Sequence, residues 1–204
     1  MPELRWLTAG ESHGPELVTI VEGLPAGLQL TVDMIDADLA RRQRGYGRGG
    51  RMKIETDRVT IVGGVRGGET LGSPLAMRIA NADHASWLDR MPVGPFEAPP
   101  LPLTRPRPGH ADLAGGLKYD RRDLRDVLER ASARETAARV AVGGACRALL
   151  ATQGIRIASQ VVRIGDVTVD VAALSYDEIT ERARGSDIGR DTHARRHQRD
   201  RPRR

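Results

Sequence analysis

The apolar residues of this chain gather in short runs that predict strands and in longer periodic stretches that predict helices. Apolar-rich runs predict strands at Glu3–Thr8, Leu17–Glu22, Lys53–Thr56, Val59–Val62, Leu75–Ala80 and Ile155–Ile164. The first two would flank a glycine-containing loop. The runs 53–56 and 59–62 lie on either side of Asp57-Arg58, and this arrangement predicts a hairpin.

Two helices are predicted from spacing and from capping residues. Thr31 can cap a helix that continues to about Gln43, with Ile35 and Leu39 four residues apart on one face. From about Arg121 to Thr152, apolar residues recur at intervals of three, four or seven, which predicts one long helix. The members of that repeat are Leu124, Val127, Leu128, Ala131, Ala138, Val142 and Leu149.

Further features of the long predicted helix concern its ends and its packing. Glu135 and Arg139 are spaced for an i,i+4 ion pair, and Gly154 suits the helix end. Gly143 and Gly144 lie within a stretch of small residues, so another element is expected to pack very close to it. Residues 92–108 contain seven prolines and predict an extended loop. Strands around an Ala-rich helix favour an α+β fold, with sheets packed on a helical layer.

The basic charge of the chain is confined to its last residues. Residues 190–204 hold seven Arg and two Asp, which accounts for the whole formal net charge of +5. This segment has almost no apolar residue and is predicted to be disordered. A nucleic-acid-binding arm is one interpretation. We favour a frameshifted or spurious end, because Arg, Pro, Ala and His are what a shifted frame of a GC-rich gene encodes.

Composition excludes some classes of protein. Cys146 is the only cysteine, so the chain cannot form an internal disulfide. No apolar run reaches the ~18 residues that a membrane-spanning helix needs. The first residues lack the pattern of a signal peptide, so a cytoplasmic location is expected.

Two generic motifs occur in unsuitable contexts. Residues 10–14 fit G-x-S-x-G, but a strand-like run follows where a nucleophile elbow needs a helix. Residues 45–50 fit G-x-G-x-x-G, but a predicted helix precedes them where a dinucleotide fold needs a strand. We therefore reject both a serine hydrolase and a Rossmann fold.

Histidine and arginine beside glycine are the candidate chemistry. Five arginines lie within eleven residues and could bind phosphate or carboxylate oxygens: Arg41, Arg42, Arg44, Arg48 and Arg51. A solvated basic loop is the plain alternative. His13 and His110 each lie in a glycine-flanked turn, and no histidine or cysteine spacing indicates a metal site.

Together these segments resemble chorismate synthase. The resemblance covers residues 1 to about 189 and rests on five motifs in order, GESHG, VEGLPAG, RRQRGYGRGGRM, RPGHADLAGGLKY and LERASARETAARVA. It is closest to the version common in Gram-positive-type bacteria. The resemblance implies a β-α-β sandwich in which antiparallel sheets pack on a central helical layer. Here the sandwich is incomplete, because residues 1–189 match only the N-terminal portion of that domain.

The resemblance also implies a lyase reaction, the anti-1,4-elimination of phosphate from 5-enolpyruvylshikimate 3-phosphate to give chorismate. Reduced FMN is the implied cofactor, which lends electron density as phosphate leaves and receives the C6 hydrogen. NADPH would be a possible source of its electrons, and a homotetramer is implied for the full-length family. The alternatives are an inactive fragment that binds flavin or phosphate weakly and, less favoured, a nucleic-acid-binding protein that uses the basic tail.

The motifs carry family roles onto particular residues of this chain. His13 is expected to donate a hydrogen bond or proton to the departing phosphate, and His110 to lie near the flavin and favour its anionic reduced form. The remaining implied site residues are Arg42, Arg48, Arg107 and Arg134 for substrate or NADP, and Arg130, Ala131 and Ser132 for FMN.

Overall fold

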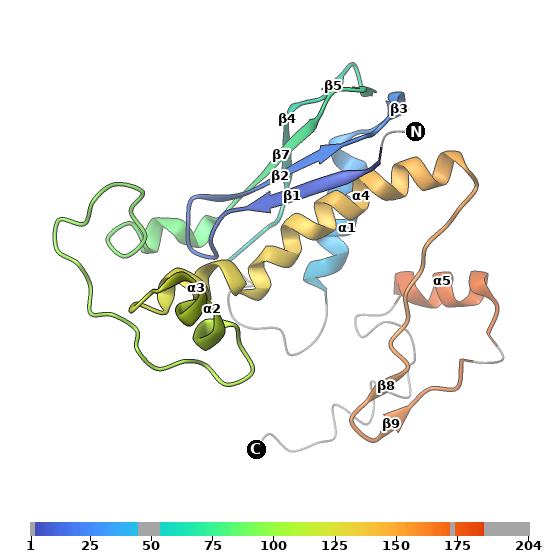
Figure 1. Cartoon of the computed structure of the whole chain (residues 1–204). Helices are drawn as coiled ribbons and strands as arrows, with labels where there is room; N and C mark the ends of the chain where they lie inside the picture. The colour runs from blue at the N-terminus through green and yellow to red at the C-terminus, as the bar shows by residue number, and fades with distance from the viewer. Residues whose placement is uncertain (1–2, 45–53, 172–173, 186–204) are drawn as a thin grey trace.

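The computed structural model of the chain describes residues 3–44, 54–171 and 174–185. Its main sheet has four strands in the order β1-β2-β7-β4, and each neighbouring pair is antiparallel (Figure 1). These strands are β1 (Arg5–Ala9), β2 (Glu16–Glu22), β7 (Leu75–Ala80) and β4 (Val59–Gly63). A smaller sheet has the order β3-β6-β5, with bounds Ala26–Gln29, Glu69–Leu71 and Val65–Arg66.

One face of the main sheet forms the core. Alternate residues of β2 and β7 are at most 1% exposed, namely Leu17, Thr19, Val21, Leu75, Met77 and Ile79. Successive side chains of a strand point to opposite faces, so this alternation buries one face and leaves the other outside. The strands predicted at 17–22 and 75–80 are therefore confirmed.

Helices α1 (Val32–Gln43) and α4 (Thr136–Thr152) cover the buried face of the sheet (Figure 1). They approach each other closely at Gly144, where a Cβ atom would lie 3.2 Å from the Cα of Ile35. The expectation that the small residues near Gly144 admit a close neighbour is confirmed. A sheet packed on a helical layer also confirms the α+β fold class.

The local signals for α1 and for the ion pair on α4 are confirmed. The hydroxyl of Thr31 accepts a hydrogen bond from the Met34 amide, which satisfies one of the orphan N–H groups of α1. Glu135 and Arg139 form the i,i+4 ion pair at 2.6 Å. Gly154 follows α4 with φ +69°, a conformation that favours glycine.

The single helix predicted over 121–152 is wrong, because the chain breaks it at Ser132. Residues there form α3 (Arg125–Ala131), the short 3-10 helix η3 (Ala133–Glu135) and α4. Ser132 has ψ 148°, which is extended, and its hydroxyl accepts a hydrogen bond from the Arg134 amide. Serine at a helix N-terminus offers the backbone this alternative bond, so it starts a new turn where apolar spacing alone predicts continuity.

The hairpin predicted around Asp57-Arg58 is also wrong. Residues 54–58 form no strand, while Lys53 lies outside the described residues. The side chain of Gln43 takes the place of a partner strand, since it donates to the carbonyl of Glu55 at 2.6 Å and accepts from the Asp57 amide at 3.3 Å. Glu55 and Asp57 are each only 4% exposed, whereas Ile54, Thr56 and Arg58 are exposed, so the two acidic side chains are what anchors this segment to the interior.

The strand predicted over Ile155–Ile164 is reduced to β8 (Arg163–Ile164), which pairs with β9 (Val167–Thr168). Together with α5 (Tyr176–Gly185) these strands lie beyond the end of α4 (Figure 1). The proline-rich residues 92–108 form no helix or strand, as predicted. The sequence did not predict α2 (Asp112–Tyr119) or the 3-10 helix η2 (Ala82–Ser86).

Candidate active site

The turn between β1 and β2 holds His13 against helix α3. The turn begins at Gly10, which has φ +105° and where a Cβ atom would lie 2.4 Å from the carbonyl oxygen of Glu16. His13 donates twice to the same oxygen of Glu129, from its backbone amide at 2.9 Å and from ring Nδ1 at 2.7 Å. The Glu129 side chain is fully buried, so this oxygen is a fixed acceptor for the histidine.

The ring of His13 is also fixed from its face and from its backbone. It stacks on Trp87 with a centroid distance of 3.9 Å and an interplanar angle of 21°. Nδ1 of His84 donates to the carbonyl oxygen of His13 at 2.9 Å. Nε2 of His13 lies 3.7 Å from an Asp83 carboxylate oxygen, which is beyond ordinary hydrogen-bond distance. The ring is therefore oriented, and among the described residues Nε2 has no close hydrogen-bond partner.

The stacked tryptophan lies among positive charges. The guanidinium groups of Arg90 and Arg125 lie over the Trp87 ring at 5.4 Å and 5.2 Å from its centroid. Arg125 also contacts the second oxygen of Glu129 at 3.2 Å. Charge-assisted contacts of this kind orient carboxylates more strongly than neutral ones. The surroundings of His13 thus combine a buried acid, an aromatic face and two guanidinium groups.

His110 is held by a second buried carboxylate. Its Nδ1 is hydrogen-bonded to Asp112, the first residue of α2, whose side chain is fully buried. The Arg107 amide donates to the other Asp112 oxygen at 2.9 Å. Burial raises the pKa of the Asp112 carboxyl, but the Arg107 amide, the His110 hydrogen bond and the positive charges of His110 and Arg107 outweigh it, so the pKa lies below its ordinary value.

The helices that carry these two carboxylates pack on each other. A Cβ atom on Gly115 of α2 would lie 2.3 Å from a methyl carbon of Val127 on α3. Only glycine at this position permits so close an approach. Helix packing thus links the segment that holds His110 to the segment that holds His13.

Acid should weaken the fold partly through Asp112. A carboxyl whose pKa is lower in the folded chain than its unfolded value of about 3.9 stabilises the fold above that value. That stabilisation is lost as the pH falls through the folded pKa. We therefore expect the free energy of unfolding to fall more steeply below about pH 5 in the parent than in Asp112→Asn. Urea unfolding across this pH range measures both slopes.

Asp126→Asn is the matched control, because the Asp126 side chain is 47% exposed and forms an exposed ion pair with Arg121 at 3.4 Å. It should keep the parental slope. A parental slope in Asp112→Asn as well would refute the assignment to Asp112.

Arg134 lies in the interior. Its guanidinium is 4% exposed, contacts Asp57, and donates to the Asn81 side chain at 2.7 Å and to the Ala80 carbonyl at 3.1 Å. A Glu55 oxygen lies 3.5 Å away. A substrate contact for Arg134 stays a prediction. Its observed contacts hold η3 against the end of β7 and against Asp57.

Asn81 joins this buried cluster to the turn that holds His13. Its amide nitrogen donates to the carbonyls of Glu11 and Gly14 at 3.0 Å and 2.8 Å, while its oxygen accepts from Arg134. An asparagine side chain has two N–H donors and an acceptor oxygen. Both donors and the oxygen of Asn81 form hydrogen bonds, so Asn81 fixes the position of the turn relative to Arg134.

Arg42 reaches the same cluster from the end of α1. It contacts Asp57 at 2.9 Å and donates to Thr136 Oγ1 at 3.0 Å and to the Ala133 carbonyl at 3.3 Å. Asp57 therefore receives two guanidinium groups, those of Arg42 and Arg134. Arg48, the other predicted anion-binding residue of this segment, lies outside the described residues.

The predicted FMN residues lie at the end of α3 and at the break before η3. Arg130 donates to the carbonyl and the hydroxyl of Thr8 at 2.9 Å and 2.8 Å, and its side chain remains 40% exposed. Ala131 and Ser132 follow at the break between the helices. Burial raises the pKa of the nearby Glu135 carboxyl, but hydrogen bonds from Thr8 and Arg139 lower it below its usual value.

Arg107 contributes charge rather than a buried contact. It is exposed, and its charge acts on Asp112. The structure thus brings His13, Arg134 and Arg130 to the region around β1, α3 and η3, with Arg42 reaching in from α1. His110 and Arg107 join it through α2. The convergence of both histidines on one basic recess stays a prediction.

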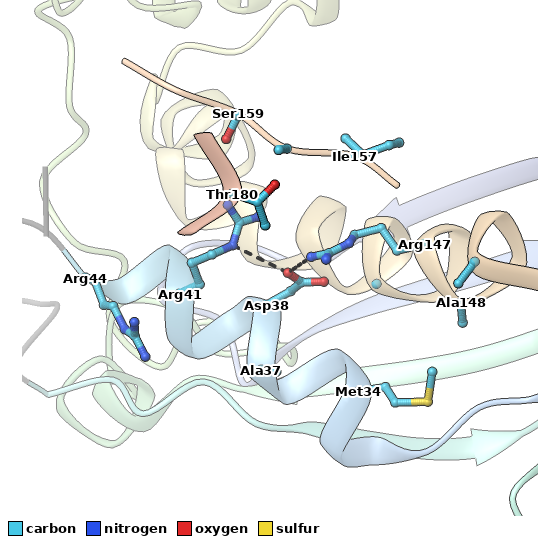
Figure 2. Close-up of a pocket in the computed structure, with 13 residues that line it drawn as sticks. Met34, Ala37, Asp38, Arg41, Arg44, Arg147, Ala148, Ile157, Ser159 and Thr180 are labelled. Atoms are coloured by element: carbon cyan, nitrogen blue, oxygen red, sulfur yellow. Dashed lines mark hydrogen bonds and ion pairs between the residues drawn. The ribbon is translucent and has the colours of Figure 1, made fainter. Parts of the chain in front are cut away.

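A separate cavity of about 640 Å³ lies between α1, α4 and residues 157–159. Figure 2 shows Arg41 and Arg147 directed at the carboxylate of Asp38 on its wall. Two of the five arginines predicted to bind anions, Arg41 and Arg44, line it, whereas no described residue to which the resemblance gives a role does. In the described ranges no cluster of His, Cys, Asp and Glu could hold a metal ion, and no helix found there is long and apolar enough to cross a membrane.

Sequence reasoning missed Glu129, Asp112, Trp87 and Asn81 as parts of the site. A signal existed for Asp112, which lies two residues after His110 in a glycine turn. Glu129 had a weaker one, as an acid inside the apolar repeat of a predicted helix. Trp87 and Asn81 had none, because their partners are distant in the chain.

An antiparallel sheet on two helices, with two histidines each held by a buried carboxylate, defines an α+β protein with two oriented histidines. The model of one protein family, described as chorismate synthase, matches residues 4–200. The chain belongs to the chorismate synthase family.

Individual relatives agree with this assignment. Chorismate synthase of Rubrobacter xylanophilus is 62% identical over 165 residues, which cover 81% of this chain and 42% of that protein. Chorismate synthase of Symbiobacterium thermophilum is 58% identical over 192 residues, which cover 91% of this chain and 49% of the relative. A crystal structure of chorismate synthase matches with a TM-score of 0.72 and 43% identity, covering 93% of this chain and 49% of its own. The chain thus spans about half the length of the relatives it matches.

Proposed function

We propose that this chain acts as a chorismate synthase, a lyase that eliminates phosphate from 5-enolpyruvylshikimate 3-phosphate to give chorismate. In this reaction the C3–O and C6–H bonds break, and phosphate departs with the C–O electron pair. The C6 hydrogen leaves as a proton overall, and the C–H electron pair stays in the ring, where the existing double bond shifts and a second one forms. The observation that carries the proposal is the fixed His13, whose Nε2 has no close hydrogen bond while Nδ1 is bound to Glu129. Family membership supports the same reaction.

His13 serves as the proton donor to the departing phosphate. Its ring is oriented by Glu129 and Trp87, so Nε2 can meet an oxygen of a bound phosphate without reorganising the site. Proton transfer by a positioned histidine typically contributes about 10²–10⁴-fold in rate. The arginines around this turn supply positive charge, which a substrate with one phosphate and two carboxylates requires.

Four arginines are proposed to hold the anionic substrate or NADP: Arg42, Arg48, Arg107 and Arg134. Their support differs. Arg107 is exposed and next to the His110 turn, so its guanidinium can turn toward a ligand. Arg42 and Arg134 form ion pairs with Asp57, so they would contribute positive charge from fixed positions at the edge of the ligand site.

The residues present fit a reduced flavin. FMN offers a phosphate and the acceptor oxygens of its ring, and the donors at hand are the Arg130 guanidinium, the Ser132 hydroxyl and the His110 imidazole. Gly109, beside His110, leaves open space where a Cβ atom would stand. When bound, reduced FMN supplies electron density to the elimination. Arg130, Ala131 and Ser132 would bind it, and His110, oriented by Asp112, would lie at its ring.

We further propose a homotetramer, a cytoplasmic location and NADPH as a possible source of electrons for the flavin. These follow from the resemblance of the chain to its family. Weak binding of flavin or phosphate without turnover is the alternative that the assay below distinguishes from this proposal.

The deciding experiment is an anaerobic assay of the purified chain with 5-enolpyruvylshikimate 3-phosphate and reduced FMN. Formation of chorismate and phosphate in equal amounts supports the proposal. A chain that unfolds cooperatively, binds FMN and forms no chorismate overturns it in favour of the binding fragment. Omitting the reduced flavin is the control and should abolish product.

A further inference from the structure

We propose that Glu129 is a positioning residue that holds His13 in the form protonated at Nδ1, so that Nε2 is the nitrogen that exchanges protons with a ligand. This inference rests on the proposed function only for its consequence in catalysis. Its physical basis is that one oxygen of Glu129 accepts from both the backbone amide and Nδ1 of His13, at 2.9 Å and 2.7 Å.

The protonation of Nδ1 follows from the nature of its partner. A carboxylate has no hydrogen to give, so a short contact to it requires the proton on the imidazole nitrogen. The other oxygen of Glu129 lies 3.2 Å from the Arg125 guanidinium. The positive charge of Arg125 thus compensates the charge of the Glu129 carboxylate and holds it in one orientation, although the Glu129 side chain is fully buried.

Trp87 limits the alternatives open to the ring. With the two rings stacked at 3.9 Å, His13 cannot tilt out of plane without losing the contact. A half-turn of the imidazole about its Cβ–Cγ bond would place a carbon at the Glu129 oxygen, which would then lose its hydrogen bond from the ring and keep only the one from the backbone amide. The stacked and hydrogen-bonded arrangement therefore selects one orientation of the ring.

Asp83 is the other acid that faces the ring. Its oxygen lies 3.7 Å from Nε2, which is too far to fix a proton there by a hydrogen bond. Nε2 can therefore pass its proton to a ligand oxygen, while Nδ1 keeps its own in either charge state of the ring. His110 is held in the same way, because its Nδ1 is hydrogen-bonded to the Asp112 carboxylate.

The test is the tautomer of His13, read from the nitrogen chemical shifts of the ¹⁵N-histidine-labelled full chain under alkaline conditions where the ring is neutral. The parent should show Nδ1–H as the main form. A parental spectrum with Nε2–H as the main form overturns the proposal without any variant. In Glu129→Gln the ionic acceptor is lost, and the Nδ1–H fraction should fall.

Glu135→Gln is the matched control. It replaces another buried glutamate of the same region, whose contacts are Thr8, Arg130 and Arg139 and not His13. It should leave the His13 tautomer unchanged. An unchanged tautomer in folded Glu129→Gln contradicts the proposal, and so does an equal loss in both variants.

A kinetic measurement tests the consequence separately. Glu129→Gln should lower kcat while KM changes little, because the lost interaction orients a proton donor and does not touch the substrate. A rise in KM at unchanged kcat contradicts the positioning role. If the parent itself forms no chorismate, the proposed function fails, yet the tautomer measurement still decides the inference.

Discussion

Arg134→Met is expected to lower the free energy of unfolding by about 3–5 kcal/mol, because it removes one partner of a buried ionic cluster. Asp57 and Glu55 would keep their charges inside the molecule with less compensation, and the Asn81 oxygen would lose its donor. Methionine fills much of the space of arginine, so the loss reports the charge and the hydrogen bonds. Urea unfolding followed by circular dichroism measures it.

Arg121→Met is the control for this prediction. Arg121 also contacts an aspartate, at 3.4 Å, but the two side chains are 60% and 47% exposed. Solvent-exposed pairs are worth about 0–1 kcal/mol. If the two variants lose the same stability, the buried cluster does not hold the fold as described.

His13→Ala is expected to lower kcat for chorismate formation by about 10²–10⁴-fold. The variant loses the proton donor, and the Glu129 oxygen loses its side-chain partner. His13→Gln should be impaired to a similar degree, because an amide can form a hydrogen bond but cannot transfer a proton in this role. Initial rates under anaerobic conditions with reduced FMN provide the measurement.

Glu69→Ala provides a background for this comparison, since Glu69 is exposed on β6 and contacts Gln29 in the smaller sheet. Its rate should match that of the parent. A His13→Gln variant with parental kcat would remove the proton donor from the proposal, and a rise in KM alone would reassign His13 to binding.

The two largest expected effects arise at residues that sequence reasoning named but whose roles differ from each other. His13 keeps a nitrogen without a close hydrogen bond, as a donor to substrate requires. The guanidinium of Arg134, in contrast, forms its contacts with buried groups of the protein itself. Both residues lie beside small residues in recognisable motifs. A motif by itself therefore does not distinguish a residue that is available to a ligand from one that stabilises the fold.

Elements that depend on neighbours in the chain could be predicted from the residues alone. The Thr31 cap of α1, the Glu135–Arg139 pair and the buried alternation of β2 and β7 all follow from local spacing, and all are present. The small residues around Gly144 likewise announced a close neighbour. The five motifs also sufficed to identify the family.

The errors occurred where a distant side chain competes with the local pattern. Gln43 satisfies the backbone of residues 55–57, so no hairpin forms there. Ser132 has no glycine or proline beside it to mark a break, yet its hydroxyl starts a new helix. Propensity describes the backbone of a segment by itself, whereas these bonds depend on which groups the fold brings near it.

Local chemistry thus specified which residues can act, namely two histidines in glycine turns and a set of arginines. The hydrogen bonds and ion pairs of these groups were decided by the folded chain, because their partners lie far away in the sequence. Glu129 lies 116 positions from His13, and Asn81 lies 53 positions from Arg134. A hydrogen bond between a carboxylate and an imidazole needs the two heavy atoms within about 3.2 Å, so it exists only once packing has brought the two groups together.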